Sequence, residues 1–273
     1  MHNNKFNLFL NLLFLFFWCE VQSHTISKPR VSIITSVFKG DDFIRGFLED
    51  IVQESIFDKC ELILINAHSP GNEEPIIKEY LDKYPNIIYV RLSSDPGLYG
   101  VWNLAIKMAS ANLITNANLD DRRNHYSCEI QARALEEDLL VDLVYGDYLI
   151  TYTPNQTFEN NTYRWIVNNP DFKPELMYYC LPGPQPMWRK SMNEKYGYFD
   201  ETFFVFGDCE MWLRAIRNGA QFKKIPDFIS GIFYDNPQGL SADQDVQKKE
   251  RREIETFRIK RANPQIWNLG IGI

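Results

Sequence analysis

The segment ANLITNANLDDRR (residues 111–123) joins a short apolar run to two adjacent carboxylates, Asp120 and Asp121. The run over residues 111–115 is typical of a buried strand. In an open α/β sheet, ligands bind outside the carboxyl ends of the strands, where these two acids would lie. Hard oxygen donors in such a place suit Mg²⁺ or Mn²⁺ bound by few protein ligands. The alternative for an Asp pair is a solvated turn that caps the next helix.

The chain before this segment alternates between strand and helix patterns. Apolar, β-branched runs predict strands over residues 31–38, 61–66 and 86–92. Apolar residues at helical spacing predict helices over residues 43–52, 73–84 and 98–109. Because the connections are short, this alternation predicts a parallel sheet covered by helices on both faces.

The second half has a less regular pattern. A helix is predicted over residues 126–137 and a long strand over residues 141–152. Residues 153–174 are rich in Asn, Pro and aromatic residues and predict a loop or lid. The prolines of residues 181–186 predict an extended segment. Helices are predicted over residues 191–198, 208–218 and 242–261, and a strand over residues 222–233.

Composition limits the class of protein. The chain has 273 residues, of which 45% are hydrophobic, enough for one large domain with a core. A net charge of −7 argues against a nucleic-acid partner, since such surfaces are normally basic. The basic run KKERR (residues 248–252) is typical of a solvated helix face, and contact with an anionic membrane surface stays open. Five cysteines show no metal-ligand spacing and do not decide the disulfide state.

The N-terminus resembles a targeting segment. Residues 8–18 are almost entirely Leu and Phe, which is the length of a signal-peptide core and short for a membrane span. Small residues at Val21 and Ser23 predict cleavage near Ser23, and therefore a secretory or extracytoplasmic protein with a signal peptide over residues 1–23. An uncleaved membrane anchor is the alternative. Asn155 and Asn160 begin Asn-x-Thr sequons, which matter only in a eukaryotic secretory pathway.

A second acidic cluster, FGDCEMWLR (residues 206–214), places Asp208 at a predicted helix start. Met211 and Trp212 follow three and four residues later, so Asp208 turns toward the packed side of this helix. A carboxylate near apolar walls has a raised pKa, which suits a general base. The alternative is an N-cap. Together with the strand-end pair, Asp208 fits metal-assisted group transfer.

Three ordered blocks resemble family 2 glycosyltransferases with the GT-A fold. VSIITSVFKGDDFIRGFLEDIVQESI (residues 31–56) and ELILINAHS (61–69) resemble the opening of that family, and DPGLYGVWNLAIKMASANLITNANLDD (95–121) its middle block. QPMWRKSMNEKYGYFDETFFVFGDCEMWLRAIRNG (185–219) resembles its acceptor-side block, and FYDNPQGLS (233–241) a tail seen in many members. The resemblance implies a Rossmann-like, mostly parallel α/β sheet and an inverting, metal-dependent hexosyltransferase-like enzyme. Its implied partners are a nucleotide-sugar donor and a glycan, lipid or protein hydroxyl acceptor.

The resemblance also implies roles for individual residues. Asp208 would be the catalytic base and Asp120 would contact the ribose or metal. Asp121 would contact the metal, Mn²⁺ or Mg²⁺, and the diphosphate, as the main metal ligand of the pair. The remaining residues are a nucleobase pocket of Thr35, Val37 and Phe38, donor-side contacts at Tyr99 and Asn103, and acceptor-side positions at Trp188 and Arg189, with Trp188 stacking on a sugar.

The implied domain has two halves, with nucleotide-sugar binding over residues 31–152 and acceptor binding and catalysis over residues 153–241. Residues 242–273 form a C-terminal helix and tail. One departure concerns Asn66, which stands where many family members carry an Asp that binds the base; an amide can still pair with a uracil or guanine edge. This departure leaves a catalytically inactive sugar- or partner-binding protein as the alternative. Arg122 and Arg123 either offset phosphate charge or balance the acids beside them.

Overall fold

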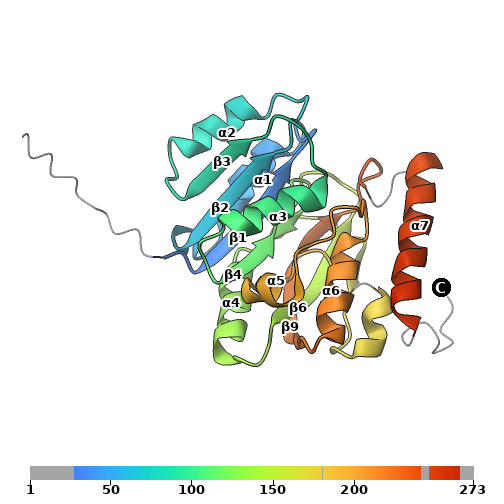
Figure 1. Ribbon diagram of the computed structural model, residues 1–273. Coiled ribbons are helices and arrows are strands. Elements are labelled where there is room, and N and C mark those ends of the chain that lie inside the picture. Colours follow the sequence, from blue (N-terminus) through green and yellow to red (C-terminus); the bar gives the residue numbers. More distant parts are fainter. Residues whose placement is uncertain (1–27, 180, 241–245, 265–273) are drawn as a thin grey trace, which may run out of the picture.

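Four parallel strands form the first half of one continuous sheet (Figure 1). They lie in the order β3-β2-β1-β4, with adjacent parallel registers that run from Val31 opposite Cys60 to Val37 opposite Asn66. Their bounds are β1 (Val31–Val37), β2 (Cys60–Asn66), β3 (Ile87–Arg91) and β4 (Leu113–Asn116). The predicted alternation of strands and helices is confirmed, with boundaries that move by up to three residues.

The computed structural model describes residues 28–179, 181–240 and 246–264. The predicted signal peptide lies outside these described residues. Within them, no helix combines the length and the apolar character needed to cross a membrane. Cys60, Cys128 and Cys209 are buried free thiols.

Helices cover both faces of the sheet because strand side chains alternate between the faces. Ile34 and Ile63 point into one core cluster with α3 (Leu98–Met108), whereas Ile33 and Leu62 point into the other with α1 (Ile44–Ile51). Two further helices share the α1 face: α2 (Glu74–Leu81) and α4 (Ser127–Glu137). A 3-10 turn, η1 (Phe57–Lys59), leads into β2.

The second half extends the same sheet with strands of mixed direction. β8 (Met187–Arg189) pairs antiparallel with β4, and β6 (Leu143–Thr151) lies between β8 and β9 (Phe222–Tyr234). The short strand β5 (Arg122–Arg123) closes the far edge against β9, and β7 (Trp165–Val167) pairs with β6. The predicted loop over residues 153–174 therefore contains a strand. β6 and β9 are parallel and share the most extensive pairing of this half.

Helices α5 (Ser191–Tyr196) and α6 (Gly207–Arg217) pack on the α3 face, after a 3-10 turn η2 (Pro174–Tyr179). An aromatic cluster connects the halves: the Trp188 and Trp212 ring centroids lie 5.3 Å apart and those of Trp102 and Phe199 5.4 Å apart. Such edge-to-face pairs are the favoured arrangement for aromatic rings in a core.

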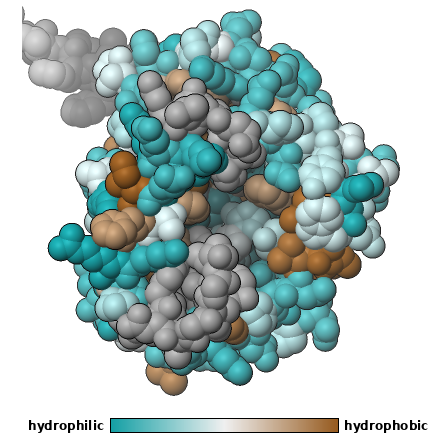
Figure 2. Space-filling view, turned by 90° about the vertical axis from the view of Figure 1, so that its right-hand side faces the viewer, coloured by the Kyte–Doolittle hydropathy of each residue, from teal (hydrophilic) through white to brown (hydrophobic). Residues whose placement is uncertain are grey.

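The last helix, α7 (Val246–Ala262), lies beside α6 at the edge of the molecule (Figure 1). Ile259 is buried in the α3-side core, so α7 is docked along one side rather than solvated all round. Its outer side is mainly hydrophilic, with exposed Ile254 and Phe257 among charged residues. The surface on this side of the molecule is largely polar and is hollowed near its centre (Figure 2).

Candidate active site

The two adjacent carboxylates follow β4 at the carboxyl edge of the parallel strands. Asp121 is only 2% exposed, and its two oxygens accept hydrogen bonds from the Tyr234 amide at 3.1 Å and from Asn118 Nδ2 at 3.0 Å. Asp120 is half-buried, and its Oδ2 accepts a hydrogen bond from Asn236 Nδ2 at 3.0 Å. Within the described part of the chain, Asp120 Oδ1 has no protein partner. The accessible oxygen of the pair thus belongs to Asp120.

The electrostatics of this pair fit a cation. Burial raises the pKa of Asp121 well above its ordinary value, and the neighbouring charge of Asp120 raises it further. Two carboxylates in contact, one of them buried, leave negative charge that a divalent ion would stabilise. The donor set of hard oxygens suits Mg²⁺ or Mn²⁺, with Asp120 as the residue that can reach the ion. Asp121 instead holds Asn118 and β9 in place beside it.

The two arginines after the pair serve the fold. Arg123 is buried, forms a 3.1 Å salt bridge with Glu54, and donates to Ser127 and Gln131. Arg122 is equally buried and donates to the carbonyls of Leu119 and Asp121. The structure favours an internal role over phosphate binding, because Arg123 donates through all three guanidinium nitrogens and Arg122 through both Nη atoms to protein acceptors.

Asp208 lies at the same edge of the sheet. It is the second residue of α6, whose N-cap position is Phe206, so Asp208 does not cap the helix. Its Oδ1 accepts hydrogen bonds from the Cys209 amide at 2.8 Å and from the Tyr99 hydroxyl at 3.3 Å. Tyr99 is in the first turn of α3, which follows β3, and this contact places Asp208 near the carboxyl ends of the parallel strands. Burial raises the pKa of Asp208, as a general base requires.

The predicted nucleobase residues differ in access. Thr35, Val37 and Asn66 are buried, whereas Phe38, which follows β1, is 40% exposed. Asn66 Oδ1 accepts a hydrogen bond from the Ser69 amide at 2.8 Å, while Asn66 Nδ2 and Thr35 Oγ1 are buried without hydrogen-bond partners. Buried polar atoms without partners are uncommon in native proteins. Asn66 is the last residue of β2, and Thr35 lies two residues before the end of the adjacent strand β1, where a base would bring acceptors or donors.

The predicted donor contacts Tyr99 and Asn103 are both buried and connect α3 to the second half. Asn103 Nδ2 donates to the Phe199 carbonyl and to Glu201 Oε1, each at 2.9 Å, and its Oδ1 accepts from the Phe199 amide. The single Tyr99 hydroxyl proton is shared between the Val205 carbonyl and, at 3.3 Å, Asp208 Oδ1. The structure therefore places these side chains as braces between the two halves.

The acceptor-side prediction for β8 needs a correction. Trp188 is 0% exposed, and its indole Nε1 donates to Asn193 Oδ1 at 2.9 Å. Arg189 donates to the backbone carbonyls of Val141, Leu135 and Asp138. The physical reason is that β8 lies in the middle of the sheet, between β4 and β6, with packing on both faces. In this arrangement a sugar cannot stack on Trp188.

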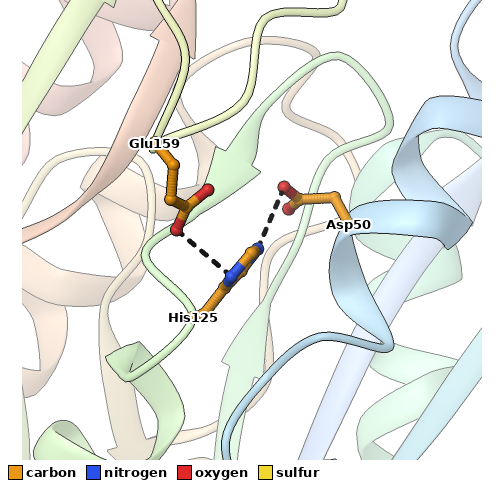
Figure 3. A group of neighbouring side chains, drawn as sticks. All are labelled: Asp50, His125 and Glu159. Carbon is orange, nitrogen blue, oxygen red and sulfur yellow. Dashed lines mark ion pairs between the residues drawn. The ribbon is translucent and has the colours of Figure 1, made fainter.

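A separate group of Asp50, His125 and Glu159 comes from α1, the segment after β5 and the segment before β7 (Figure 3). His125 Nε2 lies 3.5 Å from Asp50 Oδ1, and His125 Nδ1 lies 3.1 Å from Glu159 Oε1. Both Asp50 Oδ1 and His125 Nε2 are buried without a hydrogen-bond partner. One ligand atom from each residue lies within 4.8 Å of the others, so this group could also hold a divalent ion.

Several contributors escaped the sequence analysis. Asn236, which binds Asp120, lies inside the FYDNPQGLS segment, and its position in that block was the available signal. The Asp50–His125–Glu159 group has no such signal, because its members are far apart in sequence and only Asp50 lies in one of the quoted blocks. The support that α7 gives to the start of α6 was also missed and is described below.

This architecture and site define a class of protein. A parallel half-sheet that is extended by strands of mixed direction, with carboxylates at its carboxyl edge, is the arrangement of a GT-A-type glycosyltransferase. The chain belongs to glycosyl transferase family 2, whose model matches residues 32–197. It is therefore a glycosyltransferase, and the catalytically inactive alternative is not favoured.

Known relatives support this assignment. The chain is 24% identical over 209 residues to the uncharacterized glycosyltransferase MJ1057 of Methanocaldococcus jannaschii, which covers 75% of this chain and 70% of that protein. It is 22% identical over 228 residues to the uncharacterized glycosyltransferase YwdF of Bacillus subtilis, which covers 81% of each. A 91-residue stretch is 32% identical to the minor teichoic acid biosynthesis protein GgaB of Bacillus subtilis, over 33% of this chain and 10% of that protein.

Solved structures confirm the predicted fold class. S. aureus TarS residues 1–349 in complex with UDP-GlcNAc matches with a TM-score of 0.63 at 14% identity, over 89% of this chain and 76% of that one. The mannosyltransferase PcManGT of Pyrobaculum calidifontis, in complex with GDP-Man and Mn²⁺, matches with a TM-score of 0.58 at 15% identity, over 78% and 59%.

Proposed function

We propose that this glycosyltransferase moves a sugar from a nucleotide-sugar donor to a hydroxyl acceptor, with inversion and with help from Mn²⁺ or Mg²⁺. The observation that carries the proposal is the placement of Asp120 and Asp208 at one edge of the sheet. Asp120 presents an oxygen that no described protein group occupies, and Asp208 has a pKa raised by burial. Asp120 is therefore suited to bind a cation, and Asp208 is suited to accept a proton.

The donor would lie across the carboxyl ends of β1, β2 and β4. Phe38 offers an exposed ring for a base, and Asn66 Nδ2 and Thr35 Oγ1 are polar atoms without protein partners. Solved neighbours with the same fold hold UDP, UDP-GlcNAc or GDP-Man, which supports a nucleoside-diphosphate sugar as the donor class. Asn66 can accept or donate, so it is compatible with a uracil or a guanine edge.

The cation would be held through Asp120, with Asp121 as the buried brace behind it. A divalent ion, when bound, would stabilise negative charge on the departing diphosphate. The presence of Mn²⁺ in the PcManGT complex supports this choice of ion. The resemblance implied Asp121 as the main metal ligand, but both of its oxygens accept hydrogen bonds from protein groups, which favours Asp120 for that role.

Asp208 would take the proton of the acceptor hydroxyl. The acceptor oxygen would form its bond to the anomeric carbon on the face opposite the diphosphate, whose bond to that carbon breaks. The nucleoside diphosphate leaves with the electron pair, and the proton stays on Asp208. A positioned general base of this kind contributes about 10²–10⁴-fold to the rate.

The test uses Asp208→Asn and Asp120→Asn with a panel of UDP- and GDP-sugars and Mn²⁺. We expect Asp208→Asn to lose about 10²–10⁴-fold in kcat while it still binds donor. Asp120→Asn should lose Mn²⁺-dependent donor binding in calorimetry. Asp58→Asn, an exposed Asp in η1 before β2, is the matched control and should behave as wild type. Full transfer activity in both site variants would refute the proposal.

We also propose that the protein works in a secretory or extracytoplasmic compartment, or is held at a membrane by its apolar N-terminus. Residues 8–18 carry this proposal. N-terminal sequencing of the mature protein tests it. A new terminus near residue 24 would support cleavage, and an intact start in a membrane fraction would support the anchor. An intact start in a protein that is not membrane-associated would refute both.

A further inference from the structure

A carboxylate of the C-terminal helix binds the backbone directly before the proposed catalytic base. Glu255 of α7 accepts hydrogen bonds from the amides of Phe204, Val205 and Phe206, the last two at 3.0 Å. Glu255 is only 4% exposed. Three successive backbone donors around one carboxylate form an anion-binding nest, which is occupied here by a side chain 49 residues further along the chain.

The same short segment is held from its other side by α3. The Tyr99 hydroxyl donates to the Val205 carbonyl, and a Cβ atom at Gly207 would lie 2.6 Å from the Tyr99 ring. Residues 204–206 are therefore fixed through their amides by α7 and through a carbonyl by α3. Gly207 and Asp208 follow at once as the first residues of α6. The position of Asp208 depends on both contacts.

We propose that Glu255 is a positioning residue for Asp208, and that α7 is part of the active-site framework rather than a peripheral tail. This inference rests on the proposed role of Asp208. A charge-assisted hydrogen bond is about twice as strong as a neutral one, so an ionised Glu255 fixes these amides better than an amide side chain could. Because a small misplacement of a catalytic group lowers the rate steeply, the loss of this nest lowers kcat more than substrate binding.

The remaining α7 contacts explain how Glu255 stays in place. Arg258 forms a 3.0 Å salt bridge with Asp200 and lies over the Phe203 ring, and Arg251 lies over the Phe204 ring. These contacts surround the nest but do not form it. They provide a docking control, because a variant at Arg258 weakens the attachment of α7 without removing the carboxylate.

Glu255 also has an electrostatic signature that a purely structural residue would lack. Among the described residues, the pKa of Asp208 responds to the Tyr99 hydroxyl from α3, to the Glu255 carboxylate from α7, and to the backbone amides of Cys209 and of Asp208 itself. Burial is the main cause that raises the pKa of Asp208, and the negative charge of Glu255 raises it further. Its removal therefore moves the acidic limb of the kcat profile to lower pH.

The experiment compares Glu255→Gln, Glu255→Asp and Glu253→Gln in the full chain. Glu255→Gln should lower kcat about ten- to a hundredfold with an unchanged donor KM, and should move the acidic limb to lower pH. Glu255→Asp keeps the negative charge on a shorter side chain that cannot bind all three amides, so kcat should fall while the acidic limb of the pH profile stays at the same pH. Glu253→Gln, an exposed position on the same helix, should match wild type.

Thermal unfolding separates positioning from loss of fold. Arg258→Ala should lower Tm without moving the acidic limb. If Glu255→Gln matches Glu253→Gln in kcat and in the pH profile, the inference is overturned. The inference is also overturned if the Glu255 variants lose activity only in proportion to unfolded protein. If Asp208→Asn keeps full activity, the proposed function fails instead, whatever Glu255 does.

Discussion

The two proposed acidic sites are built in different ways. Asp120 and Asp121 follow a central strand, and their support comes from Asn118 next to them and from the end of β9. Asp208 begins a helix, and its support comes from side chains of α3 and α7 that are more than 45 residues away in sequence. A site that the sheet itself holds resists changes far from it, whereas a site held by distant helices can be tuned from them.

This contrast separates stability from activity. Substitutions of the buried charged residues beside Asp120 and Asp121 should lower the stability of the whole fold, because β4, β5 and α4 are joined there by buried charges. Damage to the contacts around Asp208 should leave the sheet intact and change the proton chemistry.

Arg123→Met should be the most destabilising change. It leaves Glu54 buried without its partner, and a buried ion pair broken on one side typically costs about 3–5 kcal/mol. Urea unfolding measures the loss, with a matched drop in Tm. The double variant Arg123→Met with Glu54→Met should regain part of it, because no charge is then stranded. If the single variant loses less than about 1 kcal/mol in the free energy of unfolding, the Arg123–Glu54 pair does not stabilise the strand end that carries Asp120.

Asp121→Asn should change the free energy of unfolding less than Arg123→Met does, and should raise it instead of lowering it. Burial holds the pKa of Asp121 well above that of the unfolded chain, so its contribution to stability is present at low pH and is lost as the pH rises through the folded value. Without added metal, the neutral amide should raise the free energy of unfolding at pH 8 by about 1 kcal/mol. The advantage should shrink as the pH falls toward 4. An equal difference at all pH values would contradict the buried-charge interpretation.

Tyr99→Phe tests the other site with a milder change. The Tyr99 hydroxyl lowers the pKa of Asp208, so its removal should move the acidic limb of kcat to higher pH. This shift is opposite to the one expected for Glu255→Gln, and kcat at pH 7 should fall only a few-fold, about 1 kcal/mol. Tyr84→Phe is the control, because Tyr84 packs against the other core cluster and stacks on Tyr80. A shift in the same direction for both Tyr99 and Glu255 variants would break the electrostatic argument.

The local structure around the first proposed site could be predicted from the sequence, whereas the distant support of the second could not. The strand, the turn and both acids lie within residues 111–123, so local pattern and resemblance suffice to locate them. Trp188 was misplaced because a short strand of three residues inserts into the middle of the sheet, and no periodicity is visible over so few positions. Glu255 was missed because a nest is made of backbone amides, which carry no residue signature. Its carboxylate sits in a charged helix that resembles any solvated one.

The smallest effect is expected at His125, and it decides which acids hold the metal. His125 joins Asp50 and Glu159 as a partly exposed ion-pair group, so His125→Ala should cost about 1 kcal/mol or less. Equilibrium Mn²⁺ binding should show one ion in wild type, one in His125→Ala and none in Asp120→Asn. The opposite pattern, with the ion lost from His125→Ala and kept in Asp120→Asn, would move the metal to the Asp50–His125–Glu159 group. Asp120 would then contact only the nucleotide-sugar donor, and the site at the end of β4 would bind no cation.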